Sequence, residues 1–200
     1  MMTVYNDDLT PLKIDYDLNQ ACFPTSSEGW GTILHNIDGG PKWTEQNSKT
    51  AYDLNDVYFV DGRRAWIVGS DGVILFTNDG GINWIPQESS TEYDLKGVYF
   101  TSPDEGWIVG KGGIILHTTD SGASWSSNAI EVDEDFYDVY FMDSKEGWII
   151  GQNGLVLYTK DGGVYWEREG SDAEMSLYHI AHNENSLIAI GAKGTILNIT

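Results

Sequence analysis

The sequence predicts an all-β fold, a five-bladed β-propeller made of four-stranded antiparallel blades. Three observations predict it: a 41-residue repeat, a composition that suits strands and tight turns, and a length that suits one domain. The chain has 200 residues, of which 23 are glycine and 12% are aromatic. Four short strands that recur every ~40–50 residues are typical of propeller blades, which stack in a ring because one blade cannot bury both of its faces.

The repeat is clearest in the eight tryptophans, which fall into two series with a step of 41 residues. The first series is Trp43, Trp84, Trp125 and Trp166. The second is Trp66, Trp107 and Trp148, which Trp30 joins after a deletion of five residues. One domain, 1–200, therefore divides into five blades: 16–51, 52–92, 93–133, 134–174, and 175–200 together with 1–15.

The second unit shows the four expected strands. They are predicted at Asn55–Val60, Ala65–Gly69 and Val73–Thr77, with a fourth beginning near Asn83. Short turn segments rich in Asp and Gly separate these strands. The last unit has room for only three strands, and residues 1–15 make up the missing length. We therefore expect an N-terminal strand within Thr3–Leu9 to complete the last blade, so that the ring closes without an open edge.

Charge and composition limit the partners. With 31 acidic and 11 basic residues, the net charge is −20, which repels nucleic-acid phosphates and anionic lipids. No apolar stretch is long enough to cross a membrane, so neither nucleic-acid binding nor membrane insertion is expected. The first residues lack the pattern of a secretory signal. We expect a cytoplasmic protein, or a secreted or lumenal one if a signal was removed, with association with a virus as a further alternative.

One motif recurs at the turn between the third and fourth strands. Its copies are Thr77–Trp84, Thr118–Trp125 and Thr159–Trp166, with a variant at Asn36–Trp43. The Asp carboxylate can accept hydrogen bonds from N–H groups of its own turn, while the Trp packs the hairpin against the blade. This pattern resembles the Asp-box, or BNR repeat, of sialidases and other propellers. We interpret both sets of residues as structural: Asp38, Asp79, Asp120 and Asp161, with Trp43, Trp84, Trp125 and Trp166.

The strand sequences carry a second resemblance. Segments such as Val98–Gly110, together with the repeated boxes, are similar to the photosystem II stability and assembly factor family. The resemblance extends from about Tyr16 to Thr200 and implies a propeller of such repeats with an assembly role. A sialidase would need three converging arginines, whereas Arg63 and Arg64 are sequence neighbours and Arg168 stands alone. We therefore expect no catalytic residues, no metal and no cofactor.

Propellers usually bind ligands on the face formed by the connectors between blades and the turns between the second and third strands. On that face and near the central channel we single out candidate binding residues: Trp30, Asp56, Asp71, Tyr93, Lys111, Asp138, Asn153, His179 and Lys193. The alternative is that they are ordinary solvent-exposed residues of the loops and the channel, without a binding role. The deletion after Trp30 is expected to leave a notch in this face.

Three functions remain open. The first is a non-catalytic, monomeric scaffold for protein interaction or assembly, similar to the photosystem II assembly factors. The alternative is a glycan-binding, lectin-like propeller on a secreted or viral surface, although the predicted turns differ from blade to blade, which argues against five equal sites. A sialidase-like glycoside hydrolase is disfavoured. Saturable binding to a sugar without a protein partner would favour the second, and hydrolysis of a sialoside the third.

Overall fold

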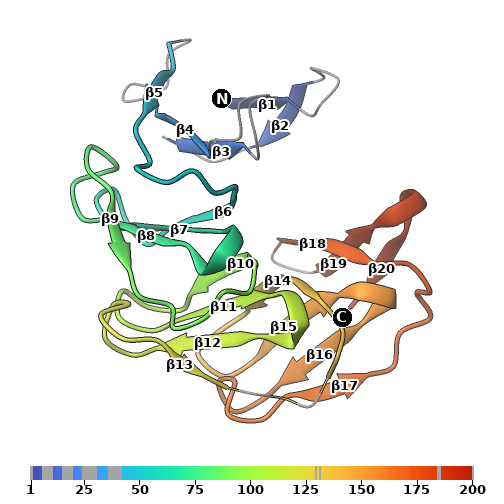
Figure 1. The fold of residues 1–200 in the computed structure, drawn as a ribbon. Coiled ribbons are helices and arrows are strands. Elements are labelled where there is room, and N and C mark those ends of the chain that lie inside the picture. Colours follow the sequence, from blue (N-terminus) through green and yellow to red (C-terminus); the bar gives the residue numbers. More distant parts are fainter. Residues whose placement is uncertain are drawn as a thin grey trace.

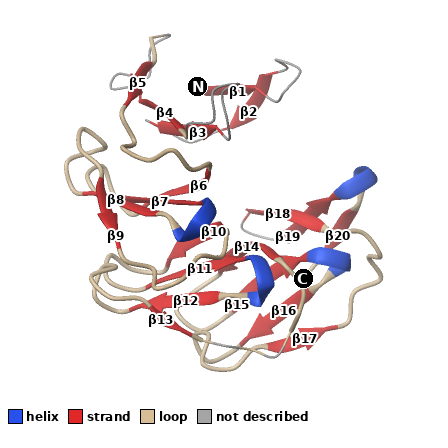
Figure 2. Cartoon of the chain, viewed as in Figure 1, coloured by secondary structure: helices blue, strands red, loops and turns tan. Residues whose placement is uncertain are grey.

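The computed structural model is all-β, as the sequence predicts (Figures 1 and 2). It describes residues 2–5, 11–14, 20–23, 31–35, 42–128, 130, 132–183 and 186–199, the first three ranges as backbone only. Figure 1 shows the sheets following one another in chain order around an arc. The first strands of successive sheets contact one another, so these strands form the inner side of the arc.

Three consecutive sheets have four antiparallel strands each, paired in chain order. Their strands are β6 (Leu54–Phe59), β7 (Ala65–Gly69), β8 (Ile74–Thr77) and β9 (Ile85–Gln87); β10 (Leu95–Phe100), β11 (Gly106–Gly110), β12 (Ile115–Thr118) and β13 (Ser126–Ser127); and β14 (Phe136–Phe141), β15 (Gly147–Gly151), β16 (Val156–Thr159) and β17 (Glu167–Glu169). The second strand of the second unit matches its predicted bounds, and the other three begin within two residues of theirs.

The first unit forms a shorter sheet. It contains β3 (Gln20–Phe23), β4 (Thr32–His35) and β5 (Thr44–Gln46), and β3 pairs directly with β4. Ile33 of β4 lies 41 residues before Ile74 of β8, so β4 corresponds to a third strand. In the described part of this sheet, no strand corresponding to β7 lies between β3 and β4. Trp30, beside which we expected a notch, lies outside the described residues.

The last sheet differs from our expectation. It contains β18 (Leu177–Asn183), β19 (Ser186–Gly191) and β20 (Ile196–Asn198), three strands in the part described. The N-terminal strand β1 (Met2–Tyr5) does not extend this sheet, but pairs antiparallel with β2 (Pro11–Ile14). Such a local hairpin closes only a short loop, whereas pairing with β20 must close the whole chain. The closed ring of five blades therefore stays a prediction.

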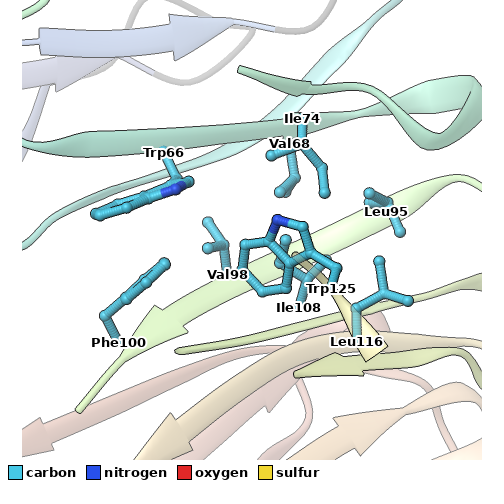
Figure 3. Packing of buried hydrophobic residues seen from close by; sticks show 9 residues of the cluster. All are labelled: Trp66, Val68, Ile74, Leu95, Val98, Phe100, Ile108, Leu116 and Trp125. Atoms are coloured by element: carbon cyan, nitrogen blue, oxygen red, sulfur yellow. The ribbon is translucent and has the colours of Figure 1, made fainter. Parts of the chain in front are cut away.

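The core lies between the sheets. In the cluster drawn in Figure 3, three residues of β7 and β8 face six residues of the next sheet. The nine are Trp66, Val68, Ile74, Leu95, Val98, Phe100, Ile108, Leu116 and Trp125. Three similar clusters lie between the remaining pairs of neighbouring sheets, beginning with the sheet β3–β5. Each second strand β7, β11 and β15 is buried along its length, because it packs against a neighbour on both faces.

Tyrosines connect the inner strands across the sheets. The ring centroids of Tyr58 and Tyr99 are 4.9 Å apart, and those of Tyr99 and Tyr140 are 5.4 Å apart. The Tyr58 hydroxyl donates a hydrogen bond to the carbonyl of Phe100 at 2.9 Å, one sheet further on. Aromatic pairs of this kind add ~1 kcal/mol beyond the area they bury, so they stabilise the stacking of sheets.

Candidate functional site

Four 3₁₀ turns join the second and third strands at one end of the sheets, η1 (Ser70–Gly72), η2 (Lys111–Gly113), η3 (Gln152–Gly154) and η4 (Ala192–Gly194) (Figure 2). The middle residue of each is left-handed: Asp71, Gly112, Asn153 and Lys193, with φ of 56°, 64°, 56° and 55°. Aspartate and asparagine tolerate this conformation better than most residues. Three predicted candidates, Asp71, Asn153 and Lys193, are thereby exposed at the tips of these turns. We call the surface formed by η1–η4 and the connectors between sheets the connector face.

Backbone groups of these turns bind the next sheet. The N–H of Asp71 donates to Asp94 Oδ1 at 3.3 Å, and the N–H of Gly112 donates to Asp135 Oδ1 at 2.9 Å. Lys111, another candidate, forms a 2.7 Å ion pair with Asp94 Oδ2. Desolvation acts to raise the pKa of Asp94, but the hydrogen bonds from Lys111 and Asp71 outweigh it and lower that pKa. The Lys111 side chain therefore forms an ion pair with Asp94 beside its own sheet and is also exposed to solvent.

The connector between the second and third sheets carries exposed polar and aromatic side chains. Tyr93 is 56% exposed, and a shallow depression is lined by Glu88, Ser90, Thr91, Glu92 and Tyr93. The carbonyl of Tyr93 accepts a 3.0 Å hydrogen bond from the N–H of Gly72, which ties the connector to η1.

Tyr52 joins the same group and was not among our candidates. Asp71 raises the pKa of Tyr52 through hydrogen bonding and through its charge, and the charge of Glu92 adds to this effect. Tyr52 precedes Tyr93 by 41 residues, so the repeat held the signal that would have found it. The structure thus brings the predicted residues Asp71 and Tyr93 into one surface with Tyr52.

A second group lies on the inner strands. Asp56, Asp138 and His179 occupy equivalent positions at irregularities in strand pairing, and Gly97 holds the position between the two aspartates. A side chain at Gly97 would meet the Cα of Asp138 at 3.0 Å, so there is little room for one. Nδ1 of His179, whose side chain is 75% exposed, lies 3.5 Å from Asp138 Oδ2.

The inner carboxylates bind backbone groups of the following sheet. Asp138 accepts the N–H of Val139 and the N–H of Ile180, each at 2.8 Å. Desolvation and the nearby charge of Asp138 raise the pKa of Asp56 to about 7. The hydrogen bond to Asp138 raises the pKa of His179, against the effect of its desolvation. Among the described residues no group of three or more His, Cys, Asp or Glu is placed to hold a metal ion.

The box turns lie apart from both groups. Asp79 Oδ1 accepts hydrogen bonds from Thr77 Oγ1 at 2.8 Å and from the N–H of Asn83 at 2.9 Å. The other carboxylate oxygen, Oδ2, accepts the Asn83 side chain at 2.8 Å. The turns of Asp120 and Asp161 repeat the first two contacts, with Ser124 and Tyr165 in place of Asn83. The carboxylates thus hold their own turns; Asp38 lies outside the described residues.

The tryptophans pack between sheets rather than facing a groove. Trp66, Trp107 and Trp148 are at most 5% exposed, and so are most core side chains around them. Of the box series, Trp84 and Trp125 are buried, and Trp84 Nε1 donates to Gln46 Oε1 of the preceding sheet at 3.0 Å. Trp43 and Trp166 are partly exposed.

The arginines do not converge. Arg64 pairs with Asp61 at 2.7 Å beside Arg63, and Arg168 pairs with Glu134 at 3.0 Å. Three arginines gathered on one anion are therefore absent from the described residues. Nor does any helix there have the length and apolar character to cross a membrane.

These observations define a class: a repeat protein of propeller-like stacked sheets with Asp-box turns. Its family is shown by sequence. The family model described as photosynthesis system II assembly factor YCF48 matches residues 35–131 and 123–199. The chain belongs to this family.

Solved structures agree with this assignment. "YCF48 bound to D1 peptide" is 23% identical, with a TM-score of 0.62 over 90% of this chain and 52% of that one. "YCF48 from Cyanidioschyzon merolae" is 25% identical, with a TM-score of 0.61 over 74% and 53%. The chain thus spans about half the length of these proteins. A more distant match, an ancestral GH74 enzyme, is 13% identical with a TM-score of 0.67 over 91% and 29%, which shows a shared fold alone. No curated protein matches the chain significantly.

Proposed function

We propose that this protein is a non-catalytic assembly scaffold that binds a polypeptide segment of a photosystem II-type partner on its connector face. One observation carries the proposal: the chain belongs to the YCF48 family, and a related YCF48 has been solved with a D1 peptide bound. The connector face supports it, because backbone hydrogen bonds between sheets hold its turns in place while side chains such as Asp71 and Tyr93 stay exposed.

The described side chains favour binding over catalysis. The box carboxylates are engaged by their own turns, and the inner carboxylates accept backbone N–H groups of the next sheet. A glycan-binding propeller would use equal sites around the ring, whereas the turn tips here are Asp71, Gly112, Asn153 and Lys193. We therefore place glycan binding second and hydrolysis third.

The experiment is a titration of the purified chain with the D1 peptide, followed by hydrogen–deuterium exchange with and without saturating peptide. We expect saturable binding and slower exchange in 70–72, 88–93 and 111–113. Exchange in the box turns, 78–83 and 119–124, serves as the internal control and should not change. Absence of binding, or protection confined to the box turns, would overturn the proposal.

We also propose that the five sheets close into a ring, in which the first sheet covers the free face of the last. Ile190 and Ile196 of the last sheet are 43% and 72% exposed, whereas Ile150 and Val156, their counterparts one unit earlier, are at most 2% exposed. The last sheet therefore carries the apolar residues with which each earlier sheet contacts its successor.

A further inference from the structure

Two half-exposed tyrosines lie among carboxylates on the connector face. Tyr52 and Tyr93 are 47% and 56% exposed, and they come from the connectors that precede two successive sheets. The Asp71 carboxylate and the charge of Glu92 both act on the Tyr52 hydroxyl and raise its pKa. With Glu88, which lines the depression beside Tyr93, these residues form what we call the tyrosine–carboxylate patch.

The backbone around this patch is fixed. The N–H of Gly72 donates to the carbonyl of Tyr93 at 3.0 Å, and Ser89 Oγ donates to the carbonyl of Thr91 at 3.2 Å. The Tyr93 ring lies against Gly112 of the next sheet, where an added Cβ would come within 3.1 Å of the ring. The patch is therefore a preformed surface, and a ligand would bind it without first ordering a loop.

The carboxylates of the patch lack ion-pair partners within the described chain. Asp71, Glu88 and Glu92 form no ion pair there, whereas the neighbouring Asp94 pairs with both Lys96 and Lys111. Aromatic faces attract cations by ~0.5–2 kcal/mol, and nearby carboxylates add to that attraction. An acidic ligand would instead meet three carboxylates that form no ion pair, on a chain whose net charge is −20.

We propose that the tyrosine–carboxylate patch binds a basic, extended polypeptide segment, with lysine or arginine side chains against the tyrosine rings and the carboxylates. This inference rests on the proposed function and names the chemistry of the partner segment. Shape and apolar contact supply part of the binding, and the charge of the patch selects basic over acidic sequences.

The test uses two fluorescein-labelled ten-residue peptides, one alternating lysine with glycine and the other alternating glutamate with glycine. Their affinities for the whole chain are measured by fluorescence anisotropy at 50 mM and 150 mM salt. The patch variant is Glu88→Gln with Glu92→Gln. Its matched control is Glu167→Gln with Glu169→Gln, which removes the same charge from exposed positions on β17. A second pair compares Tyr93→Leu with Tyr165→Leu, since Tyr165 is 74% exposed on a box turn.

We expect the lysine peptide to bind and the glutamate peptide not to. The patch variant should weaken lysine-peptide binding about tenfold, which corresponds to ~1.4 kcal/mol, and its control less than twofold. Tyr93→Leu should weaken it about threefold, and Tyr165→Leu should have no effect. Equal losses in the patch and control variants would show general attraction to an acidic protein and would overturn the inference. Binding of the D1 peptide that is indifferent to the patch variant would overturn the inference while leaving the proposed function in place.

Discussion

The carboxylate of Asp56 accepts a hydrogen bond from the backbone N–H of Val98, 42 residues further along the chain, at 2.9 Å. Asp138 accepts the N–H of Ile180 over the same separation in sequence. Both bonds join the first strand of one sheet to the first strand of the next. The two aspartates interact electrostatically across Gly97, the position between them that lacks a side chain. The two carboxylates therefore stabilise the contact between the first strands of successive sheets, although their negative charges repel each other.

The pH dependence of stability between pH 8 and pH 6 follows from Asp56. Its pKa of about 7 is raised above the unfolded value, so the native state binds this proton more tightly. Unfolding free energy should therefore rise by ~1.4 kcal/mol as pH falls from 8 to 6. The raised pKa of His179 acts in the same direction, since its contribution is lost as pH rises. Burial lowers the pKa of His35, which acts in the opposite direction because its contribution is lost as pH falls. Urea unfolding at several pH values measures this slope.

Asp56→Asn is the variant for that measurement. It removes the titrating group and the repulsion with Asp138 while keeping an oxygen that can accept one backbone N–H. We expect a shallower slope between pH 8 and pH 6, set by His179 and by His35, whose contributions have opposite signs. An unchanged slope would show that Asp56 does not titrate in this range.

Below pH 4 the box turns should reverse the trend. Hydrogen bonds from the Asn83 side chain and backbone lower the pKa of Asp79 to about 2, and similar contacts lower those of Asp120 and Asp161. A lowered native pKa gives stability that is present above the unfolded pKa and is lost as pH falls toward the native one. Thermal melts should therefore show a maximum near pH 5 and a decline below pH 4. Asp79→Asn should make that decline less steep.

The buried threonine of the box provides a sharp test of the turn. Thr77 is fully buried, and its hydroxyl donates to Asp79 and accepts the N–H of Gly81 at 2.9 Å. Thr77→Val keeps the volume but leaves both partners without this contact, which should cost ~1–3 kcal/mol. Thr101→Val is the matched control, because the buried Thr101 Oγ1 has no hydrogen-bond partner in the described chain. Chemical denaturation should show the control to be neutral or stabilising; equal losses would argue against the role given to Thr77.

Ring closure can be tested with two isoleucines of nearly equal exposure. Ile196 on the last sheet is 72% exposed, and Ile82 on a box turn is 69% exposed. If the first sheet covers Ile196, then Ile196→Glu should lower the unfolding free energy by ~1–3 kcal/mol, while Ile82→Glu changes it by less than ~0.5 kcal/mol. The difference should not depend on protein concentration, as it would if a second copy covered this face. Equal, small effects would mean that the face stays open.

The sequence predicted the parts of this fold that the repeat determines. The strand Ala65–Gly69 and the box turns were placed correctly, because tryptophan and glycine spacing fixes their register. The partner of β1 was predicted wrongly, because the repeat period does not indicate which strand an isolated N-terminal strand pairs with. Local pairing with β2 needs no closure of the whole chain.

The candidate sites were predicted less completely. Asp71 and Tyr93 were named separately, and their meeting with Tyr52 depends on turn conformation and on a hydrogen bond between blades that no pattern in one sequence reveals. The equivalence of Asp56 and Asp138 was visible in the repeat. Their interaction depends on strand irregularities beside Gly97 that only coordinates show.

In the described part of the first sheet β3 pairs directly with β4, yet Ser48 Oγ still donates to the carbonyl of Gly31 at 3.1 Å, as Ser171 Oγ does to that of Gly154 at 2.8 Å in a four-stranded unit. Ile33 likewise remains fully buried against the neighbouring sheet. The first unit, five residues shorter than the others, therefore keeps its contacts with the next sheet. Insertion and deletion within units give this architecture a way to reshape its binding surface while the stack that supports it persists.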